Sequence, residues 1–385
     1  MKFRTGIAPL AAALICGITL TARADVPPPP DIAASSYLLI DAGSNQVLVE
    51  HEAHTQLPPA SLTKIMTTYV AGEAIDAGHV KLTDSVPVSV HAWQAEGSRM
   101  FIREGTEVPL SDLLRGIIIQ SGNDASIAVA EYIGGSEDAF ANMMNQQAEK
   151  LGLKDSYFIN ATGLPAEGHH TTAWDLAQLS RALINNHPTM YAMYAERTFR
   201  FNNIDQTNRN RLLWRDRSVD GIKTGHTEEA GFCLVASAIR DNMRLISVVM
   251  GTKDDNARMD ESQKLIAYGF RHFETRELYG AGVVLKQNEV FYGDEDTVDL
   301  GLATPAVVTF PRGRYGDLKA ELEVPKILEA PYESGVEVGR LRLTLDDKPL
   351  YEAPLVTLKP VAQAGVFSRM SDFIYLFFRE LFGDD

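Results

Sequence analysis

The sequence predicts an α+β domain, followed by a smaller all-β domain and a C-terminal amphipathic helix. Helix-like and strand-like patterns are mixed up to about residue 276, whereas residues 277–360 show strand-like segments between Gly, Pro and Asp turns. Apolar residues recur at helical spacing over residues 366–382. The chain has 385 residues, more than one hydrophobic core supports, so two domains are expected.

Residues 1–24 have the pattern of an export signal. Lys2 and Arg4 form a positive start, residues 7–20 are apolar, and Ala22-Arg23-Ala24 is a small-x-small cleavage site. The apolar run is short for a membrane span. Cleavage after Ala24 removes three cations and no acid, which changes the formal net charge from -15 to -18. A protein this acidic is not expected to bind nucleic acid.

The cysteines and histidines give no sign of a disulfide or a metal site. Cys16 leaves with the signal, so Cys233 remains alone, and its apolar run at 232–235 predicts a buried small hydrophobe. His169 and His170 are adjacent on an irregular loop, which is not the ligand spacing of a zinc site, and we expect them to be solvated. No metal or organic cofactor is implied.

The first domain, residues 25–276, is expected to begin with a β-hairpin, 37–41 and 46–50 around a turn, and a strand at 86–90. The spacing of apolar residues predicts four helices, at 109–120, 124–133, 143–151 and 172–184. The last begins with Thr172 and has Asp175 three residues on, which resembles a capping box. A second hairpin, 231–240 and 243–251 around Asp241-Asn242, precedes a helix at 258–270.

Ser61 and Lys64 follow Pro58-Pro59, where a helix can begin. Residues three apart share a helix face, with Cβ atoms roughly 5–6 Å apart, so a neutral Lys64 amine could take the Ser61 proton. A general-base lysine needs burial or a cationic neighbour to lower its pKa. The alternative is an ordinary exposed helix face, because a chain of this length contains on the order of one such pair by chance.

Two further motifs suit the same chemistry. Ser121-Gly122-Asn123 lies between two apolar helices, a firm place for a hydroxyl and an amide, although Asn123 or Asp124 could simply cap the second helix. Lys223-Thr224-Gly225 combines a cation, a hydroxyl and a residue without a side chain. On a strand, this combination lets a peptide pair alongside while the hydroxyl and a nearby cation bind the peptide's carboxylate. The alternative is a turn between strands, where Gly and Thr are also common.

In this order and at these separations, the three motifs resemble those of penicillin-binding proteins and serine β-lactamases. Residues 59–64, 114–125, 208–214, 220–226 and 311–314 are most similar to the low-molecular-mass D-alanyl-D-alanine carboxypeptidases of Gram-negative bacteria. The likeness runs from about Ser36 to the C-terminus. It implies an α/β (α+β) domain of the penicillin-binding-protein and β-lactamase type, with an antiparallel sheet flanked by helices.

The resemblance implies catalytic roles for three residues and substrate-site roles for two residues beside them. Ser61 resembles the acylated nucleophile and Lys64 its general base. Ser121 would relay the proton to the leaving D-alanine, and Asn123 would hold the peptide carbonyl of the substrate. Lys223 would keep the local potential positive and so help to hold Lys64 neutral.

The same resemblance implies substrate-binding roles for five others. Thr224, with Arg258, would bind the terminal carboxylate, and Gly225 would allow close approach. The backbone N–H groups of His226 and of the nucleophile would form the oxyanion hole. Arg209 is similar to a family arginine near the cleft, and the region around residues 97 and 98 resembles the family's mobile loop.

The second domain, residues 277–360, is expected to be a β-sandwich that serves as a spacer or interaction module. Its strand-like segments lie at 283–285, 290–292, 307–310, 318–324, 335–345 and 355–358.

The tail, residues 361–385, is too short and too charged to span a bilayer and fits an interfacial helix. The alternative is a helix packed on the β domain. Acids outnumber Arg369 and Arg379 there, so attachment would depend on apolar burial rather than on anionic lipid.

Three functional hypotheses follow. The first is a periplasmic carboxypeptidase on the inner-membrane surface, which would remove the terminal D-alanine from peptidoglycan stem pentapeptides and bind β-lactam antibiotics through Ser61. The second is a serine β-lactamase, disfavoured because no Glu-x-x-Leu-Asn segment supplies a deacylating carboxylate. The third is a catalytically silent cell-wall-binding scaffold, disfavoured because all three motifs are complete. The oligomeric state cannot be predicted from the sequence.

Overall fold

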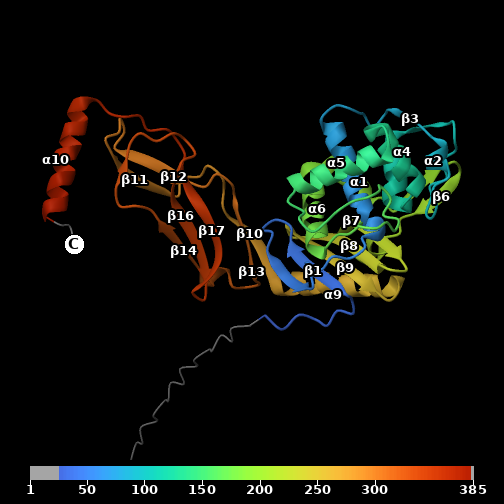
Figure 1. Cartoon of the computed structure of the whole chain (residues 1–385). Coiled ribbons are helices and arrows are strands. Elements are labelled where there is room, and N and C mark those ends of the chain that lie inside the picture. Colours follow the sequence, from blue (N-terminus) through green and yellow to red (C-terminus); the bar gives the residue numbers. More distant parts are fainter. Residues whose placement is uncertain (1–25, 383–385) are drawn as a thin grey trace, which may run out of the picture.

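The computed structural model describes residues 26–382 and contains a helix-and-sheet domain, a β domain and a terminal helix (Figure 1). This arrangement confirms the expected succession of fold classes. The export signal expected at residues 1–24 lies outside the described residues. Over residues 26–382, no helix is both long and apolar enough to cross a bilayer.

The first domain is built on a five-stranded antiparallel sheet in the order β2-β1-β9-β8-β7. Its strands are β1 (Ser36–Asp41), β2 (Val47–His51), β7 (Val219–Thr227), β8 (Gly231–Arg240) and β9 (Met243–Thr252). The hairpin turn at Asp241-Asn242 is present, and both residues have positive φ (+47° and +66°), as a type I′ turn requires. β7 is an edge strand, so one side of it is free to pair.

Alternating side chains of the sheet are buried on opposite faces. Leu38 and Ile40 belong to a core shared with most of the helices, whereas Leu39 belongs to a second core under α9 (Asp255–His272). Figure 1 shows α9 along one side of the sheet and α1, α4, α5 and α6 on the other. The sheet therefore lies between two helical layers, and both of its faces are covered.

The remaining helical segments of this domain are η1 (Ala60–Thr63), α1 (Lys64–Asp76), α2 (Val90–Trp93), α3 (Leu110–Arg115), η2 (Gly116–Gln120), α4 (Asn123–Gly134), α5 (Glu137–Lys150), α6 (Ala173–Asn186), α7 (Pro188–Tyr191), η3 (Ala192–Ala195) and α8 (Leu212–Arg215). Two small two-stranded antiparallel sheets pair β3 (Ser85–Pro87) with β4 (Glu107–Pro109) and β5 (Thr198–Phe201) with β6 (Ile204–Thr207). The expected capping box of α6 is confirmed on the Thr172 side, whose side chain accepts the N–H of Asp175.

Two elements of this domain differ from the expectation. The strand expected at 86–90 ends at Pro87, because the Ser89 side chain accepts the N–H of Ala92 and so caps α2. The helix expected at 143–151 begins six residues earlier, at Glu137, because Ser136 caps it in the same way. In both places a serine cap outweighed the local apolar pattern.

The β domain contains β10 (Phe273–Tyr279) paired with β13 (Ala306–Pro311), and a six-stranded sheet in the order β14-β16-β17-β12-β11-β15. The strands of that sheet are β11 (Lys286–Phe291), β12 (Thr297–Gly301), β14 (Leu318–Glu323), β15 (Leu328–Glu329), β16 (Glu337–Leu345) and β17 (Lys348–Thr357), and η4 (Tyr315–Asp317) precedes β14. Phe310 of β13 packs in one core with Leu341 and Leu355 of the larger sheet. The β-sandwich expectation is confirmed.

Within this domain, the strand expected at 283–285 was wrong. Val283 and Val284 follow the turn at residues 281–282, are about half exposed and belong to no strand, and β11 begins only at Lys286. Three strands, β10, β12 and β15, were not expected. The turn after β1 fastens the two domains together: the Thr275 hydroxyl donates to Asp41 Oδ2 (2.7 Å), and the hydroxyls of Ser44 and Thr309 lie 2.6 Å apart.

Candidate active site

The three sequence motifs meet at the free edge of the sheet. Ser61 lies in η1, Lys64 is the first residue of α1, and Ser121 occupies the break between η2 and α4 in a left-handed conformation (φ +64°). Lys223 lies in β7, and its Nζ donates to Ser121 Oγ at 3.0 Å. The residues that the sequence predicted to act together are therefore in contact, although they are up to 162 positions apart.

Lys64 is the centre of this cluster. Its side chain is fully buried, and its Nζ lies 3.1 Å from Ser61 Oγ, 2.7 Å from Asn123 Oδ1 and 2.5 Å from the Thr162 carbonyl oxygen. Burial and, second, the positive charge of Arg209 together lower the pKa of Lys64 to about 7, against smaller opposing effects of Asp124 and Glu137. Lys64 can therefore lose its proton near neutral pH.

The three contacts also fix the direction of the lone pair on Lys64. A neutral amine has two N–H donors and one lone pair. The Asn123 amide oxygen and the Thr162 carbonyl oxygen can only accept, so they take the two N–H groups. The lone pair then points at the third neighbour, Ser61 Oγ, which can donate its proton. This is the geometry that a nucleophile and its general base require.

Lys223 is a second buried amine beside the first. Besides Ser121 Oγ, its Nζ reaches the Thr224 carbonyl oxygen at 3.0 Å. Burial, and then the charges of Lys64 and Arg209, lower the pKa of Lys223 well below its ordinary value. Two amines so close in a buried site disfavour each other's charged form, so their titrations are coupled.

A loop across the cleft is fastened to the middle motif. The Asn123 side chain donates to the Glu96 carbonyl oxygen (2.7 Å), which turns its own oxygen toward Lys64. The buried Asp124 carboxylate accepts the backbone N–H groups of residues 100, 101 and 102. The alternative that Asn123 or Asp124 caps α4 was wrong, because Gly122 is the N-cap and no side chain caps it. No sequence pattern indicated that Asp124 holds this loop.

A second loop, residues 160–170, supplies the Thr162 carbonyl. Asn160 Oδ1 shapes its start by accepting the backbone N–H groups of Thr162 and Gly163 and the Thr162 hydroxyl. Gly163 has φ +81°, and a Cβ there would lie 1.8 Å from the Ala60 carbonyl oxygen. Only glycine therefore allows this loop to pack against the serine turn.

The expectation that His169 is solvated was wrong. His169 is 7% exposed, its Nε2 lies 3.0 Å from Thr63 Oγ1, and burial lowers its pKa to about 4. It fastens the same loop to the residue that precedes Lys64. Cys233 is buried, as expected. Among the residues that the structure describes, no group of three His, Cys, Asp or Glu side chains could hold a metal ion.

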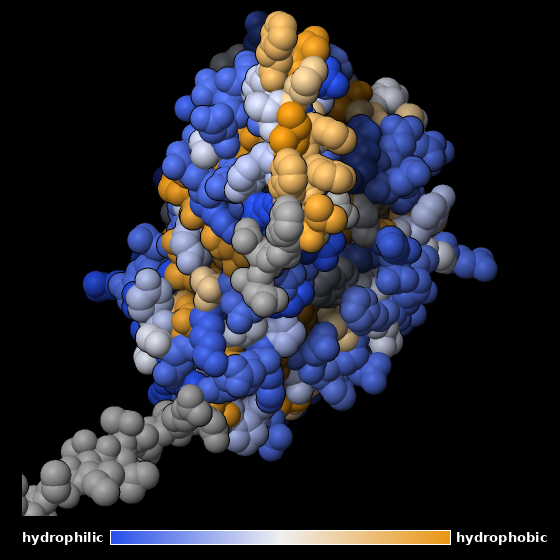
Figure 2. All heavy atoms as spheres, turned by 90° about the vertical axis from the view of Figure 1, so that its left-hand side faces the viewer, coloured by the Kyte–Doolittle hydropathy of each residue, from blue (hydrophilic) through white to orange (hydrophobic). Residues whose placement is uncertain are grey.

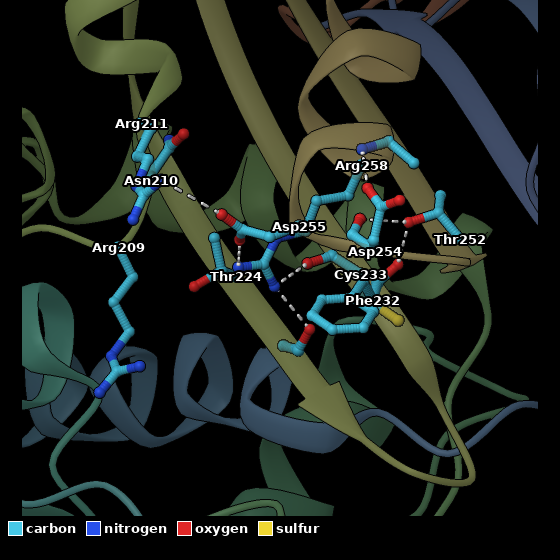
Figure 3. Close-up of polar contacts among 12 residues, drawn as sticks. Arg209, Asn210, Arg211, Thr224, Phe232, Cys233, Thr252, Asp254, Asp255 and Arg258 are labelled. Carbon is cyan, nitrogen blue, oxygen red and sulfur yellow. Dashed lines mark hydrogen bonds and ion pairs between the residues drawn. The ribbon is translucent and has the colours of Figure 1, made fainter.

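The two arginines of the cleft differ in their availability. Arg258 reaches from α9 to β7, where its Nη1 donates to the Gly225 carbonyl oxygen (2.9 Å) and its Nη2 pairs with Asp255 (Figure 3). Arg209 is exposed and is anchored by its Nε to the Gln120 carbonyl oxygen (2.9 Å), and Figure 3 shows its guanidinium on the other side of Thr224. The outer N–H groups of Arg209 are therefore available to a ligand, whereas those of Arg258 are largely committed.

Gly225 and His226 lie where the sequence placed them, on β7. A Cβ at Gly225 would lie 3.2 Å from both Leu62 Cγ and the Pro59 carbonyl oxygen, so the glycine lets β7 pack against the serine turn. His226 is exposed and its ring packs against Phe232, with centroids 4.0 Å apart. Gly225 thus allows close approach within the protein itself.

Fold and site together define an acyl-serine enzyme of the penicillin-binding class. Residues 22–254 match the Peptidase_S11 family, described as D-alanyl-D-alanine carboxypeptidase, and residues 273–363 match the C-terminal domain of penicillin-binding protein 5. The chain belongs to this family of D-alanyl-D-alanine carboxypeptidases.

Individual relatives agree with this assignment. D-alanyl-D-alanine carboxypeptidase DacA of Escherichia coli (strain K12) is 43% identical, over 97% of this chain and 96% of the relative, and DacC of the same strain is 44% identical over 92% and 90%. Penicillin-binding protein 5 from Haemophilus influenzae superposes with a TM-score of 0.85 at 40% identity, covering 87% of this chain and 99% of that one. The β-lactamase and silent-scaffold alternatives are set aside: the chain is a serine-type D-Ala-D-Ala carboxypeptidase.

Proposed function

We propose that Ser61 carries the acyl group and that Lys64 is its general base. Neutral Lys64 takes the Ser61 proton while Ser61 Oγ bonds to the carbonyl carbon of the penultimate D-alanine. The C–N bond to the terminal D-alanine then breaks, and the proton passes through Ser121 to the leaving amine. The three contacts of the Lys64 amine carry this proposal, because they aim its lone pair at Ser61.

Hydrolysis completes the cycle. Water bonds to the acyl carbon, Lys64 takes the proton of that water, and the bond between the acyl carbon and Ser61 Oγ breaks as the proton returns to Oγ. Lys223 holds Ser121 in place and adds positive potential, which favours the negative charge that develops on the carbonyl oxygen. The backbone N–H groups of Ser61 and His226 receive that oxygen, and Asn123 holds the substrate's next carbonyl.

The terminal carboxylate of the substrate is proposed to bind at Thr224 and Arg209. The Thr224 hydroxyl faces the cleft from the edge strand, and the free N–H groups of Arg209 suit a carboxylate. Arg258, the partner expected from the resemblance, instead holds the backbone of β7 and acts on the carboxylate through that strand. The substrate is a peptidoglycan stem pentapeptide ending in D-Ala-D-Ala, and β-lactams acylate the same serine.

We further propose the division of the chain into an export signal (1–24), a catalytic domain (25–276), a β domain (277–360) and an anchor (361–385). The anchor helix, α10 (Val366–Phe382), presents an apolar stripe to solvent, which Figure 2 shows as a column of hydrophobic side chains. Phe367 is 90% exposed and Phe373 61%. An exported chain with such a stripe would lie on the periplasmic face of the inner membrane.

Contacts with the β domain leave this stripe free. The Asp372 carboxylate accepts the N–H of Tyr292 (2.7 Å), and the Tyr375 ring stacks on Phe291 with centroids 6.0 Å apart. One side of α10 therefore packs on the β domain, as the alternative expected, while the apolar stripe stays exposed. These contacts support the proposal that the β domain orients α10 before the helix binds to the membrane surface.

Release of D-alanine from a peptide ending in D-Ala-D-Ala tests the proposed chemistry. The chain without its signal segment should release one D-alanine per peptide, and Ser61→Ala and Lys64→Gln should not. Equal release by Ser61→Ala would overturn the assignment of the nucleophile. Release by Lys64→Gln with an unchanged pH profile would overturn that of the base.

A further inference from the structure

A cavity of about 570 Å³ opens beside the serine turn and takes no part in the chemistry described above. It is lined by residues 56–60, which lead directly into Ser61, by the loop 163–170, by Thr227 at the end of β7, and by Glu229 just beyond that strand. The cavity therefore adjoins the nucleophile and the end of the edge strand at the same time.

Three points in order along β7 relate this cavity to the substrate. The Asn210 side chain donates to the Gly221 carbonyl oxygen (2.9 Å), which places the neighbouring Arg209 beside the first half of the strand. Gly225 packs against the serine turn, and Thr227 lines the cavity. A peptide that pairs antiparallel with this free edge, with its carboxylate at Arg209, passes the serine and then enters the cavity.

The lining of the cavity is acidic. Its only ionisable side chains are those of Glu167, Glu229, His169 and His170, and no lysine or arginine lines it. Both glutamates are exposed, and no contact within residues 26–382 pairs either carboxylate with a cation. His169 is buried against Thr63 and stays neutral, so it does not offset their charge. A cationic group entering the cavity would meet two free carboxylates.

We infer that this cavity is an upstream subsite, which receives the residue preceding D-Ala-D-Ala and prefers one with a free amine at the end of its side chain. The inference rests on the proposed function, because the direction of the peptide follows from the carboxylate site. A diamino acid in the peptidoglycan stem carries such an amine. The subsite acts on substrate choice and not on the chemical step.

Three peptides that differ only at this residue test the inference. They are acetyl-X-D-Ala-D-Ala with X as lysine, Nε-acetyl-lysine or glutamate, and the readout is kcat/KM for D-alanine release. We expect lysine to exceed Nε-acetyl-lysine by about threefold to tenfold at low salt, with glutamate lowest, because two exposed carboxylates act on one charge. Raising the salt from about 0.02 M to about 0.5 M should reduce the ratio, since exposed charges are screened.

Charge-neutral variants locate the effect. The double variant Glu167→Gln/Glu229→Gln should lose the lysine preference, whereas Glu149→Gln, which removes an exposed glutamate from another face, should keep it. The ratio of lysine to Nε-acetyl-lysine is compared within each variant, so a general loss of activity cancels. If the double variant does not fold, as judged by its thermal unfolding, the two single variants should each halve the ratio or more.

Two outcomes separate the subsite from the proposed function. Equal kcat/KM for the three peptides, or a lysine preference that survives in the double variant, overturns the subsite while leaving the carboxypeptidase chemistry intact. If no peptide releases D-alanine and Ser61 is not acylated by benzylpenicillin, the proposed function itself fails.

Discussion

Replacing Arg209 with glutamine is expected to shift the pH dependence of Ser61 acylation to higher pH. Acylation needs neutral Lys64, so its rate should rise as the pH rises through the Lys64 pKa of about 7. At that value about half of the amines are neutral at pH 7, whereas at the ordinary 10.5 roughly one in three thousand would be. Burial causes most of this change, and the Arg209 charge adds to it.

Removal of the Arg209 charge raises the Lys64 pKa, because a positive neighbour disfavours the ammonium form. Arg209 is exposed and therefore screened, so we expect a rise of about half a unit. Well below the midpoint, that rise corresponds to about threefold slower acylation at equal saturation. The direction of the shift follows from the Arg209 charge itself, which is the largest cause of the lowered Lys64 pKa after burial.

The assay is the rate constant of acylation by a fluorescent penicillin, measured from pH 5 to pH 9. Arg209 is also proposed to bind carboxylates, so the amplitude of the profile will fall in Arg209→Gln, and the midpoint is the quantity to compare. Arg217→Gln, which removes another exposed arginine, should leave the midpoint unchanged. A wild-type rate that does not change between pH 5 and pH 9, or an unshifted midpoint in Arg209→Gln, would refute the reasoning.

Three further predictions concern the loop that supports Lys64 and the anchor. Gly163→Ala should lower the free energy of unfolding by at least about 1 kcal/mol more than Gly168→Ala does. Both glycines have φ +81°, but only at Gly168 is there open space for a Cβ. Equal chemical denaturation midpoints for the two variants would contradict the contact at Gly163. Asn160→Ala should slow acylation about tenfold, because it releases the Thr162 carbonyl. Asn160→Asp should keep the turn and move the pH midpoint of acylation upward, because a nearby negative charge favours the ammonium form of Lys64. Identical pH profiles of acylation for the wild type and both variants would contradict this role of Asn160. Phe373→Asp should reduce sedimentation with vesicles of neutral lipid, and binding that appears only with anionic lipid would contradict attachment by apolar burial.

Elements with strong local signals were predictable from the sequence. The β8–β9 hairpin was predicted to within one residue, because Asp241 and Asn242 accept the positive φ that its turn needs. α10 was predicted with its full bounds from apolar spacing alone. β10 was missed because it follows α9 without a Gly or Pro between them, and its pairing with β13 is a tertiary contact that leaves no local pattern.

The site was predictable to the extent that side-chain types define it. Ser61, Lys64, Ser121 and Lys223 carry distinctive chemistry at fixed separations, and the structure brings them together. The Thr162 contribution is a backbone carbonyl, which any residue has, so no residue type could indicate it. The burial of His169 depends on a contact with Thr63, 106 positions away, and a loop of polar residues gives no sign of it.

The acyl-enzyme is the central claim, and intact mass after brief exposure to benzylpenicillin tests it most directly. The chain without its signal segment should gain one penicilloyl group, peptide mapping should place that group on Ser61, and Ser61→Ala should gain none. The adduct should outlast the exposure, as expected for a carboxypeptidase and not for a β-lactamase. An adduct on another residue, or none on the wild type, would contradict the account.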